Sequence, residues 1–369
     1  MRAAWAAGEP HGSGGPDDWH WQLRHSVRTA QGLGSALALT QEETRGALAA
    51  ERRGLPIAVT PYYLALCDPH DPHCPIRRQV VPTSMENDPN VGDSRDPLGE
   101  EAHTPAAHLV RRYPDRALLL ATDRCAVYCR FCTRRRRVGR GPAARSVSEL
   151  RPALEFLRAH GEIRELIISG GDPLVQSTER LSRLLEQVRT CTNIGVIRLA
   201  TRVPVVLPQR ITPELVSVLR AYHPLWVMTH FNHAKELTDQ ARKACGLLVD
   251  GGFPVNNQTV LLRGVNDDAS ALAALFRGLV QARVRPYYLL QADCACGTGH
   301  LRTPMEVGIA LMDALQGQLS GIAMPKLMVD APCGLGKVPV GRDYVVARGR
   351  GVTCLQTPGG EKVEYRDPA

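Results

Sequence analysis

The segment that decides the fold reads Cys-Ala-Val-Tyr-Cys-Arg-Phe-Cys and spans residues 125–132. Its cysteines, Cys125, Cys129 and Cys132, have the spacing C-x3-C-x2-C and follow an apolar, strand-like stretch at residues 117–122. Three thiolates at this spacing can hold three irons of a 4Fe–4S cluster and leave the fourth iron open, whereas four-cysteine sites mostly carry electrons. The alternatives are three ordinary buried cysteines or a zinc site that lacks its fourth ligand. We interpret the pattern as a cluster with an open iron.

Downstream of the cysteines, apolar β-branched runs alternate with amphipathic stretches. The runs lie at residues 117–122, 163–169, 194–201, 225–231, 255–262 and 284–290. The amphipathic stretches lie at residues 147–160, 179–191, 213–222, 239–249, 269–282 and 304–319. Strands that alternate with helices indicate parallel β/α units. Because the units are fewer than those of a closed eight-stranded barrel, we predict an α/β fold with a partial, open (β/α)6 barrel and catalytic groups at the carboxyl ends of its strands.

Length and composition are those of a globular protein. The chain has 369 residues, of which 44% are hydrophobic. No apolar run reaches the roughly 20 residues that span a bilayer, and the first residues lack the basic-then-apolar pattern of a signal peptide. We therefore expect a cytoplasmic protein without membrane contact, in which the cysteines outside residues 125–132 are small apolar side chains rather than disulfides.

The formal net charge is +8, and a basic run at residues 134–137 follows the third cysteine directly. Such a run would suggest nucleic acid if it stood alone. Aromatic residues make up only 5% of the chain, so platforms for base stacking are scarce. We expect instead that these arginines face small anionic groups, namely carboxylates and a phosphate, and that nucleic acid is not a partner.

The remaining sequence supplies the boundaries of the chain's regions. Helices are expected at residues 19–30 and 40–53, the second with a capping box of Thr40 and Glu43. The Asp-Pro-His repetition at residues 68–73 could bind a metal, but turn chemistry explains it more simply. The predicted regions are a disordered tail at 1–16, a helical and wrapping segment at 17–110, the barrel at 111–325 and a C-terminal segment at 326–369.

Two short motifs lie near the expected barrel ends. Gly170, Gly171 and Asp172 follow the second strand, where the glycines allow a close backbone approach and the acid can pair with an ammonium; a tight turn is the alternative. Lys337 lies on a glycine-containing loop near the C-terminus. Without further information, such a lysine is interpreted as a solvated surface charge.

Long, ordered matches make the chain resemble the lysine 2,3-aminomutase family of radical S-adenosylmethionine enzymes. The resemblance runs from about Trp19 to Val346. It is carried by residues 60–64, 112–116, 133–136, 204–210, 229–233, 258–267, 285–288 and 299–303. The family implies three cofactors: the cluster, S-adenosylmethionine that chelates the open iron, and pyridoxal 5'-phosphate.

The resemblance also implies roles for individual residues. Positions around S-adenosylmethionine are matched by Phe131, Gly170, Gly171, Asp172, His230 and Gln258. Lys337 matches the family's Schiff-base lysine, and the cradle for the pyridoxal phosphate group is matched by Arg112 and Arg116, whose planar forks suit phosphate oxygens. The substrate carboxylate is assigned to Arg134, and its side-chain ammonium to Asp293 and Asp330.

The implied activity is that of an isomerase. The family moves the α-amino group of L-lysine to the β-carbon through a pyridoxal phosphate imine, and two carboxylates suit a cationic side chain. Arginine stays open as the substrate, because a guanidinium also pairs well with carboxylates. A non-catalytic iron–sulfur protein would leave Lys337, Arg134 and the aspartate pair without a role. An enzyme that modifies a protein-bound lysine would need an open pocket.

The sequence departs from some family members in three places. Those members bind a zinc ion between subunits through cysteines, but position 268 is Asp268 here and only Cys354 lies beyond Lys337. We therefore predict no structural zinc, while a homodimer or higher homo-oligomer stays expected. Residues around Asp293 differ as well, namely Leu290, Ala292, Cys294 and Cys296. The electron for the cluster is expected from an external one-electron reductant, a flavodoxin or a ferredoxin.

Overall fold

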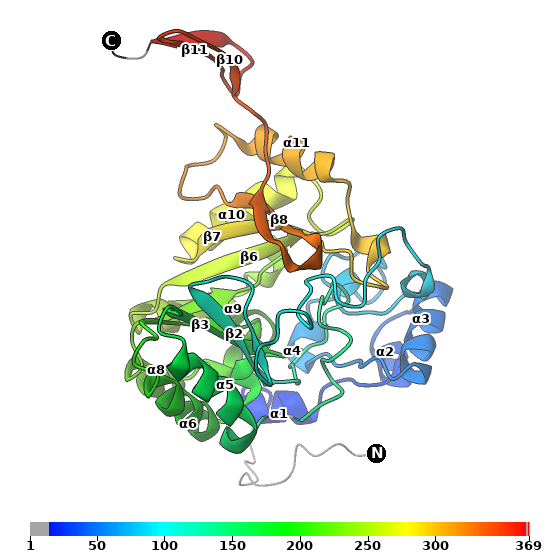
Figure 1. Cartoon of the computed structure of the whole chain (residues 1–369). Helices are drawn as coiled ribbons and strands as arrows, with labels where there is room; N and C mark the ends of the chain where they lie inside the picture. Colours follow the sequence, from blue (N-terminus) through cyan, green and yellow to red (C-terminus); the bar gives the residue numbers. More distant parts are fainter. Residues whose placement is uncertain (1–14, 143, 367, 369) are drawn as a thin grey trace.

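The apolar runs of the sequence form neighbouring strands of one curled sheet (Figure 1). The computed structural model describes residues 15–142, 144–366 and 368. In that part of the chain, nine strands follow one another in chain order, parallel from β2 to β8, with antiparallel strands at both ends. The bounds are β1 Leu109–Val110, β2 Arg116–Thr122, β3 Glu165–Gly170, β4 Val196–Ala200, β5 Leu225–Thr229, β6 Val255–Leu261, β7 Arg285–Gln291, β8 Lys326–Ala331 and β9 Gly336–Pro339. The predicted open α/β barrel is confirmed.

Helices follow the parallel strands and cover the outer face of the sheet (Figure 1). The long ones are α5 Val147–Ala159, α6 Thr178–Arg189, α8 Pro213–Arg220, α9 Asp239–Asp250, α10 Ala269–Gln281 and α11 Met305–Leu315. Each begins and ends within four residues of the amphipathic stretch that predicted it. A capping box fixes the start of α5, since the Ser146 hydroxyl accepts from the Glu149 N–H and the Glu149 carboxylate accepts from the Ser146 N–H.

Side chains alternate along the strands, so that one face of the sheet packs against the helices and the other face lines a cavity. Leu119, Ile168 and Leu199 are fully buried and belong to the core between sheet and helices. Their neighbours Leu118 and Ile167 line a cavity on the inside of the sheet. Because side chains of a strand point alternately to its two faces, the same short runs build the core and the wall of the cavity.

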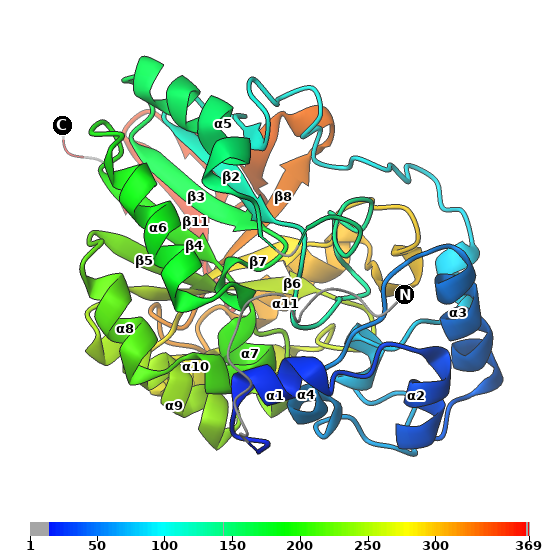
Figure 2. The ribbon, with the colours of Figure 1, turned by 90° about the horizontal axis from the view of Figure 1, so that it is seen from below.

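The N-terminal helices lie along one side of the barrel (Figure 2). They are α1 Trp19–Arg24, α2 Ala30–Ala36, α3 Gln41–Arg52 and α4 Pro61–Leu64. The single helix expected at residues 19–30 is wrong in extent: it ends at Arg24, Val27 pairs with Val59 in a β-bridge, and a new helix begins after Thr29. The capping box of α3 is present as predicted. The tail expected to be disordered, residues 1–16, falls almost wholly outside the described residues.

The chain after α11 continues the barrel sheet. β8 pairs parallel with β7, and β9 turns back antiparallel, which sets Asp330 opposite Lys337. Tyr113, before β2, accepts a hydrogen bond from the Lys337 N–H at 2.8 Å, so the two ends of the curled sheet meet. Beyond them, β10 Val345–Gly349, β11 Val352–Gln356 and β12 Lys362–Arg366 form a separate sheet that projects from the body (Figure 1).

Short helical turns complete the connections. They are α7 Val203–Val206 and the 3-10 helices η1 Arg77–Gln79, η2 Ser84–Asn87, η3 Pro173–Val175, η4 Pro208–Arg210, η5 Ala234–Glu236, η6 Gly299–Leu301 and η7 Pro332–Gly334. Among the described residues, no helix combines the length and the apolar character that crossing a bilayer requires.

Candidate active site

One cavity of about 550 Å³ lies on the inside of the curled sheet. All the site residues proposed from the sequence line it, although they come from distant parts of the chain. They are Arg112, Arg116, Cys125, Cys129, Phe131, Cys132, Arg134, Gly170, Gly171, Asp172, His230, Gln258, Asp293, Asp330 and Lys337. The cavity thus places the cysteines, the glycine motif and the C-terminal lysine in a single site. Their individual roles stay predictions.

The cysteine loop follows β2 and is held from outside by the N-terminal segment. The Tyr128 N–H donates to the carbonyl of Ala58 at 3.0 Å. The Arg130 guanidinium is buried and bonds the buried Glu86 carboxylate, with 2.7 Å between Nε and Oε1. These contacts fix the loop's backbone without using the thiols, which leaves the three sulfurs available as ligands.

The three thiols suit a cluster rather than a single ion. Burial raises the pKa of the Cys132 thiol to about 11 and that of Cys125 well above its usual range, so iron has to displace the proton from each. Within the described residues, no three Cys, His, Asp or Glu side chains are grouped as ligands of one ion. A 4Fe–4S cluster does not need such a group, because each thiolate binds a different iron.

The two glycines after β3 lie against the cysteine loop. A Cβ at Gly170, where φ is 118°, would lie 2.2 Å from the Thr122 carbonyl oxygen. A Cβ at Gly171 would lie 2.2 Å from the Arg124 carbonyl oxygen. No side chain fits at either position, so the glycines allow the ends of β2 and β3 to approach each other beside the cysteines.

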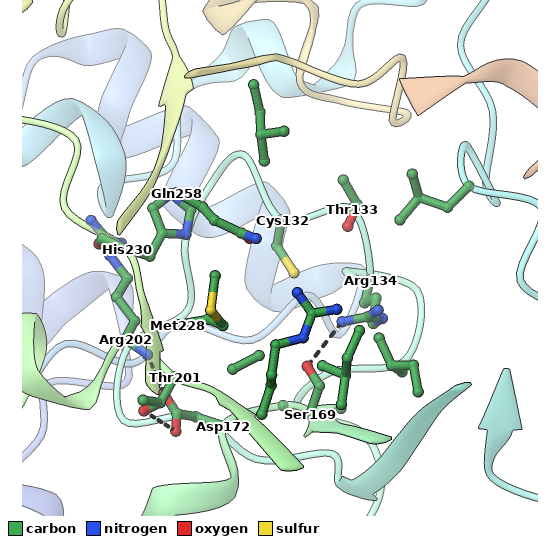
Figure 3. Close-up of a pocket in the computed structure, with 18 of the residues that line it drawn as sticks. Cys132, Thr133, Arg134, Ser169, Asp172, Thr201, Arg202, Met228, His230 and Gln258 are labelled. Atoms are coloured by element: carbon green, nitrogen blue, oxygen red, sulfur yellow. Dashed lines mark hydrogen bonds between the residues drawn. The ribbon is translucent and has the colours of Figure 1, made fainter. Parts of the chain in front are cut away.

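The Asp172 carboxylate is already bonded by the protein. It accepts from the Thr201 hydroxyl at 2.6 Å and from the N–H groups of Arg202 at 2.7 Å and Leu174 at 3.1 Å (Figure 3). A carboxylate has about four acceptor positions, and these donors occupy most of them. Asp172 therefore joins the ends of β3 and β4 whether or not it also contacts a cofactor amine.

Arg202 lies at the centre of a buried network that sequence reasoning missed. One terminal nitrogen lies 2.8 Å from the Cys129 sulfur. The other bonds the Glu236 carboxylate at 2.7 Å and the Tyr63 hydroxyl at 3.0 Å, and also reaches Gln79. A charged residue two positions after the end of β4 was the available signal, since catalytic groups gather at the carboxyl ends of parallel strands.

Aromatic and amide side chains line the wall next to this network. The His230 ring lies 5.3 Å from the Phe131 ring and bonds the Asn232 side chain at 3.0 Å. Burial, with Arg202 nearby, lowers the pKa of His230 to about 3, which keeps the ring neutral. Gln258 points into the same part of the cavity (Figure 3). This wall offers neutral hydrogen-bonding groups and a flat apolar ring.

Arg134 projects into the cavity and is held by an acid that the sequence did not reveal. Its Nε donates to the buried Glu100 carboxylate at 2.7 Å, and one terminal nitrogen lies 3.3 Å from the Ser169 hydroxyl (Figure 3). Although burial alone would raise it, Arg134 holds the pKa of Glu100 below its usual value. The other terminal nitrogen lies 2.7 Å from the Glu100 carboxylate, so Glu100 and Ser169 together orient a guanidinium that lines the cavity.

At the other end of the cavity, charged groups from β1–β2, β7 and β8–β9 come together. The Lys337 ammonium contacts the Asp330 carboxylate, which also pairs with Arg112 at 3.1 Å. Burial, together with the charge of Asp330, raises the pKa of Asp293 to about 7. Among the described residues, no donor bonds the Asp293 side chain. This end therefore holds two adjacent carboxyls, one of which already binds an amine.

An aromatic side chain, Tyr113, and a basic one, Arg116, lie next to Lys337. Arg116 lies 3.7 Å above the Tyr113 ring and pairs with Asp115 at 2.8 Å. Tyr113 in turn bonds the backbone of Lys337. Arg112 and Arg116 thus lie on the same side of the cavity as the lysine, as a group that carries a phosphate would require.

Comparisons with known proteins agree with this arrangement. Residues 119–275 match the family model of the Radical SAM superfamily, and residues 312–369 match that of Lysine-2,3-aminomutase. The chain is 43% identical over 352 residues to the L-lysine 2,3-aminomutase of Clostridium subterminale, covering 95% of this chain and 84% of the relative. It is 44% identical to that of Acetoanaerobium sticklandii, covering 95% and 85%. Glutamate 2,3-aminomutase of Clostridioides difficile is 36% identical, with 96% and 84% covered.

The curled parallel sheet, with three cysteines after its first parallel strand, defines an enzyme of the radical S-adenosylmethionine class. Such an enzyme uses a 4Fe–4S cluster and S-adenosylmethionine. Within that class, the chain belongs to the lysine 2,3-aminomutase family and is an isomerase.

Proposed function

We propose that this aminomutase moves the α-amino group of L-lysine to the β-carbon and so forms β-lysine. The observation that carries the proposal is the pair of Asp293 and Asp330 in the cavity that the three cysteines also line. Two neighbouring carboxyls favour a cationic side chain, because like charges repel until a cation lies between them. The ammonium of Lys337 already contacts Asp330, which supports an amine at this position.

The cofactors supply the reactive groups, and the residues of this chain hold them in position. When bound, the cluster with S-adenosylmethionine supplies a carbon radical that removes hydrogen, and pyridoxal phosphate supplies a conjugated ring that stabilises the migrating nitrogen. Cys125, Cys129 and Cys132 are the proposed cluster ligands. Lys337 is the proposed attachment point for pyridoxal phosphate, beside the arginines that suit its phosphate.

The substrate is held at both ends in this proposal. Arg134, oriented by Glu100, binds the α-carboxylate from the wall of the cavity. The side-chain ammonium lies between Asp293 and Asp330. Anchoring both ends leaves the α- and β-carbons at a fixed place, which is the positioning that a reactive radical requires.

The segment at residues 94–105 helps to exclude water. The backbone of Gly99 lies so close to the β8–β9 turn that a Cβ there would be 2.7 Å from the Cys333 carbonyl carbon. His103 holds the segment by bonding the Gly99 carbonyl at 2.7 Å. The segment thus covers part of the cavity, and shielding a radical from water limits its side reactions.

The test is turnover of single amino acids by the anaerobically reconstituted enzyme. The chain is loaded with iron, sulfide and pyridoxal phosphate, then incubated with S-adenosylmethionine, a reductant and L-lysine, L-arginine or L-glutamate, and the β-isomers are separated by chromatography. We expect β-lysine as the main product. Turnover of arginine alone would move the assignment to an arginine aminomutase, and turnover of glutamate alone would contradict the cationic site.

Lys337→Ala tests the cofactor assignment separately. The variant should lose the visible absorbance of pyridoxal phosphate bound to the protein, while it keeps the absorbance of the cluster. The cluster therefore serves as an internal control for folding. If the pyridoxal band is unchanged, another lysine holds the cofactor.

A further inference from the structure

A second, small cavity lies against the cysteine loop. Its volume is about 50 Å³, and it is lined by all three cysteines together with Leu55, Pro56 and their neighbours. The cysteines line the main cavity as well, so both cavities reach the cysteine loop. Leu55 and Pro56 are partly exposed. The N-terminal segment thus supplies two partly exposed apolar residues to the wall of a cavity that the three cysteines also line.

Three arginines lie next to these two residues. Arg52 and Arg53 end the α3 helix just before Leu55, and Arg140 reaches the carbonyl oxygen of Arg53 at 3.5 Å. All three side chains are exposed. Arg53 contacts the neutral side chain of Asn87. Within residues 15–142 and 144–366, none of the three forms an ion pair with a carboxylate.

More positive charge lies beneath the rim. Arg28 and Arg124 both act on the Tyr128 hydroxyl, and Tyr128 lines the small cavity. Burial, with Arg124 nearby, lowers the pKa of Arg28. Positive charges that face solvent in a cluster attract negatively charged partners over about a Debye length.

The nearby acids do not neutralise this face. Glu86 is buried in ion pairs with Arg130 and Arg135, and Asp123 pairs with Arg145. Glu51 accepts from the N-terminal N–H of α2. Asp88 is an exposed acid next to Asn87. Glu51 is exposed as well, and two exposed acids against three exposed arginines still leave the face positive by one charge.

We propose that this surface, the outer cluster face formed by Arg52, Arg53, Leu55, Pro56 and Arg140, docks the protein that reduces the cluster. The partner is an acidic one-electron carrier whose redox group is surrounded by carboxylates. It loses one electron, and the cluster gains that electron without any bond or proton being transferred. A small apolar centre inside a charged rim suits a transient complex. The proposal depends on the cluster and not on the identity of the amino-acid substrate.

The test measures cluster reduction rather than turnover. Reconstituted holoenzyme is mixed in a stopped-flow instrument with reduced flavodoxin, and the loss of cluster absorbance is followed without substrate. Arg53→Glu/Arg140→Glu should lower the second-order rate constant by about tenfold or more at low salt, as expected for lost electrostatic steering. The difference should shrink at high salt. Binding of oxidised flavodoxin, measured by fluorescence anisotropy, should weaken in parallel.

Two controls keep the result specific. Arg220→Glu makes a charge reversal at an exposed arginine at the end of α8, on the opposite side of the molecule from α3 (Figure 2). It should keep the wild-type rate, so an equal loss would point to net charge and overturn the proposal. Reduction by dithionite, which needs no docking, should be unchanged in all variants. A wild-type rate with flavodoxin in the double variant would also overturn it, as would an equal loss with dithionite.

Should the double charge reversal fail to take up iron, Arg53→Gln/Arg140→Gln replaces it. This pair removes charge without adding repulsion, and both side chains are exposed. It should give an intermediate rate with flavodoxin. A rate equal to that of the wild type would contradict the proposal.

Discussion

The two ends of the main cavity balance their charges in different ways. At the cluster end, Arg202 is buried and bonds Glu236, Tyr63 and the Cys129 sulfur, so its charge is matched within the protein. At the amine end, Asp293 faces Asp330, and its pKa is raised to about 7. The charge at the cluster end is matched within the protein before any ligand binds. At the amine end, the repulsion between the two carboxyls decreases when a cation binds. We infer that the cluster end raises the free energy of unfolding. The amine end lowers the free energy of unfolding, and the same two carboxyls favour binding of a cationic substrate.

The largest effect is expected from Arg202→Leu. It leaves the fully buried Glu236 carboxylate without its cation. Breaking a buried ion pair in this way typically costs about 3–5 kcal/mol. The free energy of unfolding of the cofactor-free chain, from a denaturant titration, should fall by that order. The iron content after reconstitution should fall as well, because the donor to the Cys129 sulfur is lost.

Arg283→Leu is the matched control for the buried pair. Arg283 and Asp250 form an ion pair at 2.6 Å, but their side chains are 53% and 66% exposed. Exposed pairs contribute little, so this variant should unfold like the wild type. If both variants lost the same free energy of unfolding, burial would not explain the stability that the Arg202 ion pair contributes.

Asp293→Asn probes the amine end and should act in the opposite direction on stability. It removes the charge of a carboxyl that burial and Asp330 disfavour, so the unfolding temperature of the cofactor-free chain at pH 8 should rise. The kcat/KM for lysine should fall by about 10- to 100-fold, which is typical for the loss of one hydrogen bond to a charged group. A variant that lost stability as Arg202→Leu does would show that the two ends are alike.

The difference between the two ends also explains what the sequence could predict. The strands, the cysteine loop and the glycine motif follow from local patterns, and each was found within a few residues of its place. The Arg202 network was not predicted, because Tyr63 and Gln79 lie 139 and 123 positions away from Arg202 in the chain. Such partners meet only through the folding of the N-terminal segment onto the barrel.

The C-terminal strands escaped prediction for another reason. β8 and β9 are short and include charged and glycine residues, so their alternation is weak. They form because backbone pairing with β7 continues the sheet. The sequence indicated Lys337 only through the family resemblance, and the register of β8 and β9 then explains why it meets Asp330. Glu100 had no local pattern at all, although it orients Arg134.

The pH dependence of lysine turnover should show the smallest effect and separates the two ends most directly. The pKa of Asp293 is raised to about 7, so the carboxyl is ionised above that pH and protonated below it. Only the ionised form attracts an ammonium, and therefore kcat/KM for lysine should fall up to tenfold for each pH unit below about 7, since this parameter reports groups of the free enzyme. Asp293→Asn should abolish that decline between pH 6 and 8, because no carboxyl titrates at position 293. The rate of cluster reduction by dithionite, measured over the same range, serves as the control at the cluster end, where Asp293 makes no contact. If the decline persists in the variant, another group governs substrate binding, and Asp293 is not the residue that meets the ammonium.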